Sequence, residues 1–339
     1  MKGNNSIIFL FIFLLIYLIN YIQTENFINE SRSIINLKIK VNNFQKIMGS
    51  RPFPDLIYLN GKFTLIDYLG RIFIKSENEK EISNVTLIWN QTIDNCEDLF
   101  KSSINIIEID LSNFDASIVT SMTNMFENCE KLEYINFGDI NTSSVVDMSY
   151  LFKNCFSLLS LDLSKFDVSK VKLMKEMFKG CFLLTSIDMT NFNTSKVLSI
   201  ESMFYDCHSL SEIDLSYMDV SKVTNMENLF ADCFGLTSLN LNNFNTSSVT
   251  NMKGLFSACT SLEILEISKF DTSNVKDMSF MFNGCELLTS LNLSNFDTFF
   301  VEDMESMFNF CSSLISIDIS SFDTFFVNNM KDMFFFVLL

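Results

Sequence analysis

The chain has 339 residues, of which 41 are acidic and 24 basic, so its formal net charge is −17 at neutral pH. Nucleic-acid backbones and anionic lipid surfaces attract clustered lysine and arginine, and the charge balance argues against both as partners. A cationic partner or a divalent cation is compatible with this balance.

The first segment in chain order is an apolar run from Ile7 to Ile19, which follows Lys2 and ends at Asn20. Its 13 residues are fewer than the roughly 20 that a membrane-spanning helix needs, and the length is typical of a secretory signal. We predict a signal peptide over residues 1–24 and a secreted or cell-surface protein. No small-residue cleavage motif precedes Gln23, so the alternative is an uncleaved segment that anchors the chain in a membrane.

Residues 25–84 do not repeat and contain both prolines of the chain. Leu56–Leu59 and Lys62–Ile66 flank Asn60-Gly61, a dipeptide typical of the type I′ turn of a β-hairpin. Ile34–Val41 and Arg71–Lys75 are further strand candidates. A stack of repeats needs its first unit covered, so we predict a small β-rich N-terminal cap here rather than a second functional domain.

From about residue 85 to the end, the chain repeats with a period of 26 residues. Cysteine recurs at this step from Cys129 to Cys311, and phenylalanine recurs from Phe100 to Phe334. A fixed period between 20 and 50 residues indicates a repeat architecture, in which each unit buries its apolar face against the next. We therefore predict a repeat domain over residues 85–339, whose last unit is incomplete.

One unit combines two apolar periods. Leu184, Ile187 and Met189 alternate with polar residues and predict a short strand, and residues 191–195 (N-F-N-T-S) predict a turn. Residues 197–207 carry apolar side chains at spacings of three and four, which predict a short helix or 3₁₀ turn. The expected fold is an α/β repeat solenoid, with a parallel sheet on the concave face and helical turns on the convex face.

The repeat resembles that of the BspA-like leucine-rich-repeat surface proteins. Residues 270–295 read F-D-T-S-N-V-K-D-M-S-F-M-F-N-G-C-E-L-L-T-S-L-N-L-S-N, and the resemblance covers residues 85–334. It implies a curved leucine-rich-repeat solenoid that is displayed outside the cell and used for binding or adhesion. It implies no catalytic residues.

Composition gives little support to an enzyme. His208 is the single histidine, and no C-x-x-C motif or glycine-rich phosphate loop occurs. We predict no catalysis, no cofactor and no metal site. Eight cysteines share one repeat position, where parallel Cβ vectors favour buried thiols over disulfides, although the spacing allows both.

The strand segment carries a column of acidic residues, which alternate with asparagine in some repeats. Unit charges about 5 Å apart in water repel each other by about 0.8 kcal/mol, so the column favours a positive ligand. We predict a protein or glycoprotein ligand of basic character, with calcium as a second alternative; a solvated strand face without a ligand is the other interpretation. The candidate residues are Asp162, Asp188, Asp214, Glu266 and Asp318.

Two late repeats carry phenylalanine pairs where the others have polar residues. We expect these repeats to lose a capping serine and to form an exposed aromatic patch for binding or oligomerisation, unless the pairs are a neutral duplication. The patch consists of Phe299, Phe300, Phe325 and Phe326.

The sequence thus predicts an extracellular recognition or adhesion protein. The alternative is a structural protein that self-associates end to end through its uncapped C-terminal coil, although a truncated sequence would also explain the missing cap. If the chain passes through a glycosylating compartment, we expect modification at Asn84 and Asn90, which stand in N-x-T sequons.

Overall fold

The computed structural model describes residues 33–40, 44–49, 52–67, 69–73, 82–190 and 192–337. The predicted signal peptide lies outside these ranges. Within them, no helix is long and apolar enough to cross a membrane.

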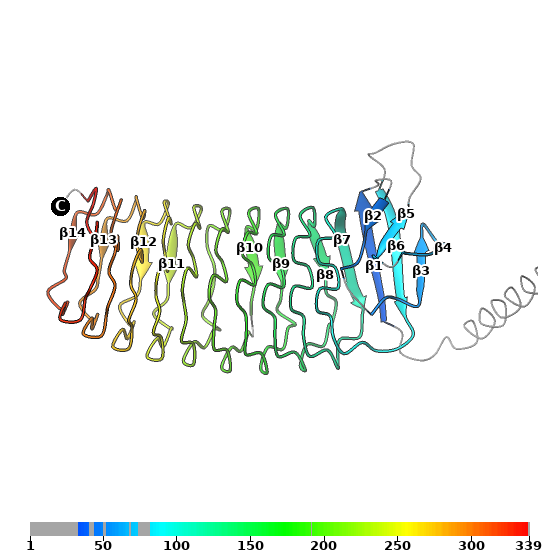
Figure 1. The fold of residues 1–339 in the computed structure, drawn as a ribbon, viewed down its shortest axis with the longest axis horizontal. Coiled ribbons are helices and arrows are strands. Elements are labelled where there is room, and N and C mark those ends of the chain that lie inside the picture. Colours follow the sequence, from blue (N-terminus) through cyan, green and yellow to red (C-terminus); the bar gives the residue numbers. More distant parts are fainter. Residues whose placement is uncertain are drawn as a thin grey trace, which may run out of the picture.

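A six-stranded sheet occupies the N-terminal side, with strand order β4-β3-β6-β1-β7-β8. β1 pairs antiparallel with both β6 and β7, and β7 pairs parallel with β8 (Figure 1). The N-terminal strands therefore continue directly into the sheet of the first repeats. Their bounds are β1 Ser33–Lys40, β3 Leu56–Leu59, β4 Lys62–Thr64, β6 Ile82–Trp89, β7 Ile106–Asn113 and β8 Tyr134–Asn136.

The predicted hairpin is confirmed. β3 and β4 pair antiparallel, and both turn residues have positive φ, 48° at Asn60 and 76° at Gly61, as a type I′ turn requires. A second antiparallel pair joins β2, Phe44–Lys46, to β5, Arg71–Phe73. Val85 lies in the antiparallel strand β6, whereas the parallel bridges between repeats begin at Asn95.

The rest of the chain forms a row of coils, each made of one 26-residue unit, which lie side by side up to the C-terminal end (Figure 1). Parallel bridges link equivalent residues of successive coils, from Asn95–Ser121 to Asp303–Asn329, with no break. The structure is therefore a repeat fold with the period that the sequence predicts.

The parallel strands do not form one continuous sheet, in contrast to our expectation. β9 pairs with β10, β11 with β12 and β13 with β14, while residues 212–214 form no strand. Each strand from β8 to β14 has three residues at most, so each pairing between them rests on few hydrogen bonds and is easily lost. The bounds are β9 Ser160–Asp162, β10 Ser186–Asp188, β11 Ser238–Asn240, β12 Ile264–Glu266, β13 Ser290–Leu291 and β14 Ser316–Ile317.

The return side of each coil, which we call the wall, contains no helix among the described residues, and the prediction of helical turns is wrong. In residues 122–129, the N–H groups of Met122, Asn124, Phe126 and Asn128 donate to carbonyls of the next coil at 2.8–3.0 Å. The N–H groups of Met125, Glu127 and Cys129 bond three residues back within the coil. Asn124 and Asn128 have positive φ, 56° and 59°, which a right-handed helix does not allow. The wall is a ladder of turns that hydrogen-bonds coil to coil.

The core between strands and wall consists of stacked columns of identical residues. From Phe100 to Phe334, phenylalanine rings of neighbouring coils stack with centroids 5.3–6.0 Å apart. All nine cysteines are buried free thiols. The Cys129 thiol donates to the carbonyl of Phe100 at 3.2 Å, and its seven successors do the same in their coils. Burial raises the pKa of Cys181 to about 12, so the thiol stays protonated.

A buried threonine ties several coils together. The Thr272 hydroxyl donates to the carbonyl oxygen of Asp297 and accepts from its N–H, both at 2.8 Å. We expect Thr272→Val to lower the free energy of unfolding by about 1–3 kcal/mol, since the N–H and the carbonyl of Asp297 both lose the partner that the buried Thr272 hydroxyl provides. Denaturant titration measures this. Thr250→Val, the same change at an exposed residue, serves as control; an equal effect of the two substitutions would contradict the account.

Candidate functional site

The predicted acidic column lies on the face formed by β8–β14 and residues 212–214, which we call the strand face. Asp162 and Asp188 end the paired strands β9 and β10 and stand opposite each other in their register. Asp214 occupies the same place in the next coil, and all three side chains are exposed. Glu266 ends β12 and Asp318 follows β14, so the residues of the column lie on one face, in separate coils.

Each aspartate of this column also closes a local turn, which our sequence analysis did not predict. Oδ1 of Asp162 accepts from the N–H and the hydroxyl of Ser164, and Oδ1 of Asp214 accepts from the N–H of Ser216. The asparagines of the column do the same, as at Asn240. These bonds occupy one carboxylate oxygen, and the other makes no hydrogen bond within the described part of the chain.

Hydrogen bonds lower the pKa of three of these carboxyls. The serine two residues later lowers the pKa of Asp162 and Asp318 mainly through its hydroxyl, and that of Asp214 mainly through its N–H. All three groups are therefore ionised at neutral pH.

A pH dependence of stability follows from these shifts. Because the folded pKa lies below the ordinary value of 3.8, the stabilisation is complete above pH 3.8 and is lost as the pH falls through the folded pKa. We expect the melting temperature to fall below about pH 4, and to fall less in D162N/D214N/D318N, since asparagine keeps the turn without titrating. Thermal melts between pH 7 and 2 test this; identical curves for the two proteins would contradict it.

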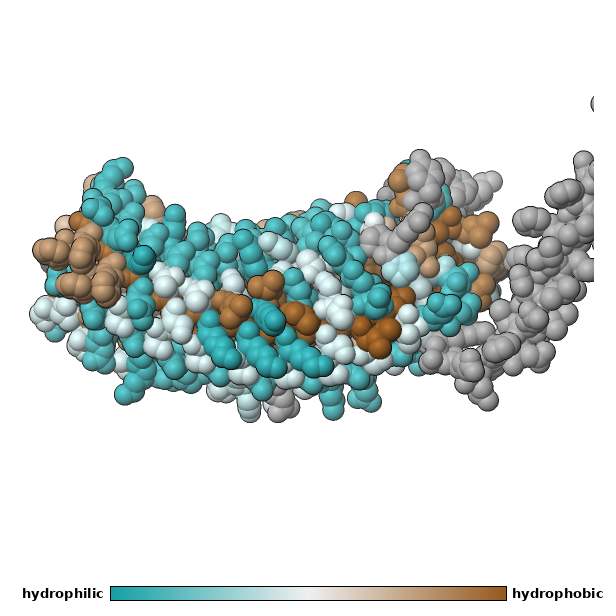
Figure 2. All heavy atoms as spheres, turned by 60° about the horizontal axis from the view of Figure 1, so that its bottom comes forward, coloured by the Kyte–Doolittle hydropathy of each residue, from teal (hydrophilic) through white to brown (hydrophobic). Residues whose placement is uncertain are grey.

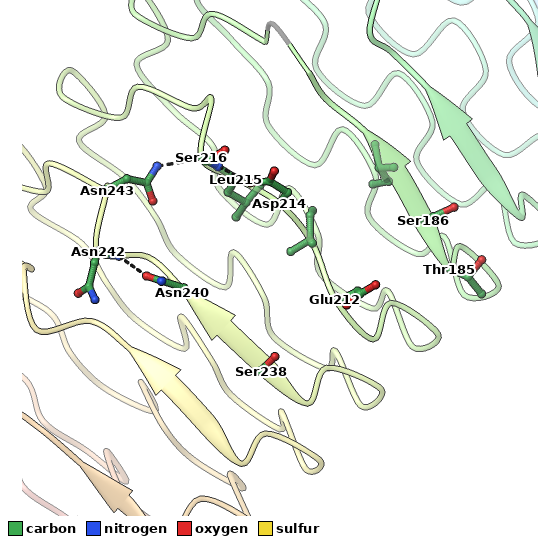
Figure 3. Close-up of a pocket in the computed structure, with 12 residues that line it drawn as sticks. Thr185, Ser186, Glu212, Asp214, Leu215, Ser216, Ser238, Asn240, Asn242 and Asn243 are labelled. Atoms are coloured by element: carbon green, nitrogen blue, oxygen red, sulfur yellow. Dashed lines mark hydrogen bonds between the residues drawn. The ribbon is translucent and has the colours of Figure 1, made fainter.

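The strand face is hollowed around Asp214. A hollow of about 740 Å³ lies between β10 and β11, over the coil that forms no strand (Figure 3). An adjoining hollow of about 520 Å³ lies over β9 and β10. Asp214, Ser186 and Ile187 line both. The larger hollow is also lined by Thr185, Glu212, Ile213, Leu215, Ser216, Ser238, Asn240, Asn242 and Asn243.

The lining offers three kinds of contact. Carboxylates of Glu212 and Asp214 attract positive charge, and the hydroxyls and amides of Ser186, Ser238 and Asn240 both donate and accept hydrogen bonds. Ile187 contributes apolar surface. The arrangement can bind and orient a polar, positively charged segment. Among the described residues, no group of three or more histidine, cysteine, aspartate or glutamate side chains is placed to hold a metal ion.

The predicted aromatic patch is present as a cluster, and Figure 2 shows hydrophobic side chains gathered at the C-terminal end of the molecule. Phe299, Phe300, Phe325 and Phe326 are 40, 51, 77 and 43% exposed, and their ring centroids lie 4.9–6.4 Å apart. The expected loss of a cap is wrong. The N–H of Phe299 still donates to Oδ1 of Asp297 at 3.0 Å, because the turn needs the aspartate and only a backbone N–H from the following residue.

His208, the single histidine of the sequence, has close partners in the structure. Its ring is half-buried between Phe182 and Phe234, with centroid distances of 4.7 and 4.5 Å, and Nε2 lies 3.0 Å from Oδ1 of Asp206. The signal was in the sequence, since His208 shares its repeat position with Phe156, Phe182 and Phe234. Asn84 in β6 and Asn90 just after it are exposed, and their glycosylation stays a prediction.

A family model described as "Mycoplasma protein of unknown function, DUF285" matches residues 69–184, 120–239, 180–265 and 232–337. The chain belongs to the DUF285 family. The overlapping matches cover the repeats of this chain and the end of the non-repetitive segment that precedes them, from residue 69 to residue 337. No curated protein matches the sequence.

One solved structure is a leucine-rich repeat protein from Bacteroides ovatus, determined at 1.19 Å resolution. The two sequences are 18% identical, and the TM-score is 0.21. The aligned region covers 72% of this DUF285 chain and 79% of the Bacteroides ovatus chain. That score is too low to support an argument from one protein to the other.

Proposed function

We propose that this DUF285 protein is an exported leucine-rich-repeat protein of the BspA-like type that recognises another protein through its strand face, without catalysis. The observation that carries the proposal is the pair of adjoining hollows around Asp214. A repeat fold is consistent with protein–protein recognition, because stacked coils present a long surface whose side chains vary while the scaffold stays constant.

Charge and hydrogen bonding favour a basic partner. Asp162, Asp188 and Asp214 follow one another in three successive coils, and each keeps one carboxylate oxygen outside its turn. Lysine or arginine side chains of a partner would bond to these oxygens, and such charge-assisted bonds are stronger than neutral ones. Ile187 and Leu215 would exclude water beneath them.

The location outside the cell rests on the apolar N-terminal segment and on the repeat's resemblance to surface proteins. Secretion or display at the cell surface, and a role in adhesion, are parts of the proposal. The partner would be a protein or glycoprotein.

The test is binding of the full mature chain to a panel of basic and neutral extracellular glycoproteins, with D162N/D188N/D214N as the variant. Asparagine keeps the local turns, as the natural Asn136 and Asn240 show, so the variant removes charge alone. D167N/D219N/D271N is the matched control, because these aspartates close the same kind of turn away from the hollows.

We expect saturable binding that weakens at least tenfold in the strand-face variant and stays unchanged in the control. Equal losses of affinity in both variants would show that the net charge of the protein, and not the strand face, governs binding. Binding that persists in both variants but is lost on changing Phe299 and Phe325 to serine would place recognition at the aromatic cluster instead.

A further inference from the structure

A second charged surface lies on the turn edge of the coils, after the strands. It consists of two columns of equivalent residues, and we call the two together the lysine strip. The first column is Lys170, Lys196 and Lys222. The second column is Val146, Lys172 and Leu198. Backbone bonds hold the second column together, since the N–H of Lys172 donates to Val146 O and that of Leu198 donates to Lys172 O, both at 2.9 Å. The four lysines are therefore held at the spacing of adjacent coils.

The lysines of the strip are exposed and make no ion pair within the described residues. Two lysines of the wall behave differently, since Lys153 and Lys175 each contact a glutamate of the next coil at 2.7 Å. Asp167 and Asp219 lie near the two ends of the first column. The hydroxyl of the serine two residues later is the main cause that lowers the pKa of each carboxyl, and the lysine three residues later adds to it. Four lysines against two aspartates leave the strip positive on a protein whose net charge is −17.

The lysines replace residues that stabilise other coils. At the same repeat position, the Ser144 and Ser248 hydroxyls donate to the carbonyl of the preceding coil at 2.8 and 2.7 Å, and the Asn274 amide does so at 2.9 Å. Among the described residues, the side chains of Lys170, Lys196 and Lys222 make no bond of this kind. Three successive coils thus give up an inter-coil hydrogen bond for an unpaired charge, a departure of the kind expected at a functional surface.

Apolar side chains flank the central lysine of the second column. Val146 is 37% exposed and Leu198 45% exposed, one on each side of Lys172. Figure 2, which turns the lower edge of Figure 1 forward, shows hydrophobic and hydrophilic groups side by side in the middle of the molecule. A ligand for this surface therefore needs negative charges and aliphatic groups together.

We propose that the lysine strip binds an acidic polypeptide segment that carries aliphatic side chains. Carboxylates would pair with the lysines, and aliphatic groups would cover Val146 and Leu198. The strip contains neither arginine, which suits bidentate phosphate contacts, nor an aromatic ring on which a base could stack, so a nucleic acid fits it less well. The binding surface is separate from the hollows of the strand face.

The experiment measures binding of a fluorescent peptide with the sequence Glu-Glu-Leu repeated four times to the full mature chain, with octaglutamate as a probe of equal side-chain charge. K170S/K196S/K222S is the variant, since serine is the natural residue at this position in other coils. K62S/K269S/K331S removes the same charge from exposed sites elsewhere.

We expect the leucine-containing peptide to bind at least threefold more tightly than octaglutamate, and V146S/L198S to abolish that difference. The strip variant should lose at least tenfold in affinity while its melting temperature stays equal or rises, because serine restores the inter-coil bond. The control variant should bind normally. Four outcomes would each overturn the proposal. They are equal losses of affinity in both lysine variants, equal binding of the two peptides, tighter binding of duplex DNA or anionic vesicles through the same lysines, and no binding at all.

Discussion

Replacing Phe204 by alanine is expected to lower the free energy of unfolding by about 3–5 kcal/mol, the range for truncating a buried aromatic ring. Phe204 is fully buried, and its ring stacks between Phe178 and Phe230 at centroid distances of 5.4 and 5.5 Å. Removing it leaves a cavity in the middle of the row, where the coils on both sides lose a contact. Urea unfolding monitored by circular dichroism measures the effect.

Phe300→Ala is the matched control, because the Phe300 ring is 51% exposed at the turn edge. There we expect a change within about 1 kcal/mol, since less apolar surface is buried and no closed cavity forms. If the two substitutions cost the same, the stacked ring column is not the core of the fold.

Reversing one charge on the strand face should have the largest effect on recognition. Asp214 lines both hollows, so Asp214→Arg places a positive charge where a basic partner would bind. Juxtaposed like charges cost several kcal/mol, and we expect about a 100-fold loss of affinity, which corresponds to about 2.8 kcal/mol. Surface plasmon resonance against the partner found in the panel measures the loss.

Asp219→Arg controls for the turn. Asp214 and Asp219 each accept one backbone N–H two residues later at 2.9 Å, so both substitutions remove the same local bond and change the same charge. An affinity loss of equal size in the control would show that stability or net charge, rather than the hollows, governs binding.

The row of coils was predictable because one period runs through the buried columns. Cys129 and Phe126 recur without insertion, which requires equivalent residues to stack. The hairpin at Asn60-Gly61 was predictable because that dipeptide readily adopts two positive φ angles.

The wall was not predictable from apolar spacing. Spacings of three and four residues place Met122, Met125, Phe126 and Cys129 in the core equally well on a helix or on successive turns. The turns differ from a helix in their backbone hydrogen bonds to the next coil and in their residues with positive φ. The positive-φ position is occupied by Tyr150 and Glu176 in other coils, and neither residue type indicates a positive φ.

The candidate site was predictable in part. The period alone aligns Asp162, Asp188 and Asp214 on one face. Their turn bonds were foreseeable from the serine or threonine two residues later, a signal that our sequence analysis did not use for this column. The hollow over residues 212–214 lies where this segment forms no paired strand. The side-chain pattern of the segment is that of the other repeats, so the sequence does not predict the missing pairing.

Carboxyl labelling of the complex, read by mass spectrometry, tests the central claim that the strand face is the recognition surface. We predict that partner binding slows modification of Asp162, Asp188 and Asp214 and leaves Asp167 and Asp219 unchanged. Protection confined to the turn-edge aspartates, with the strand-face carboxylates still reactive, would contradict the account.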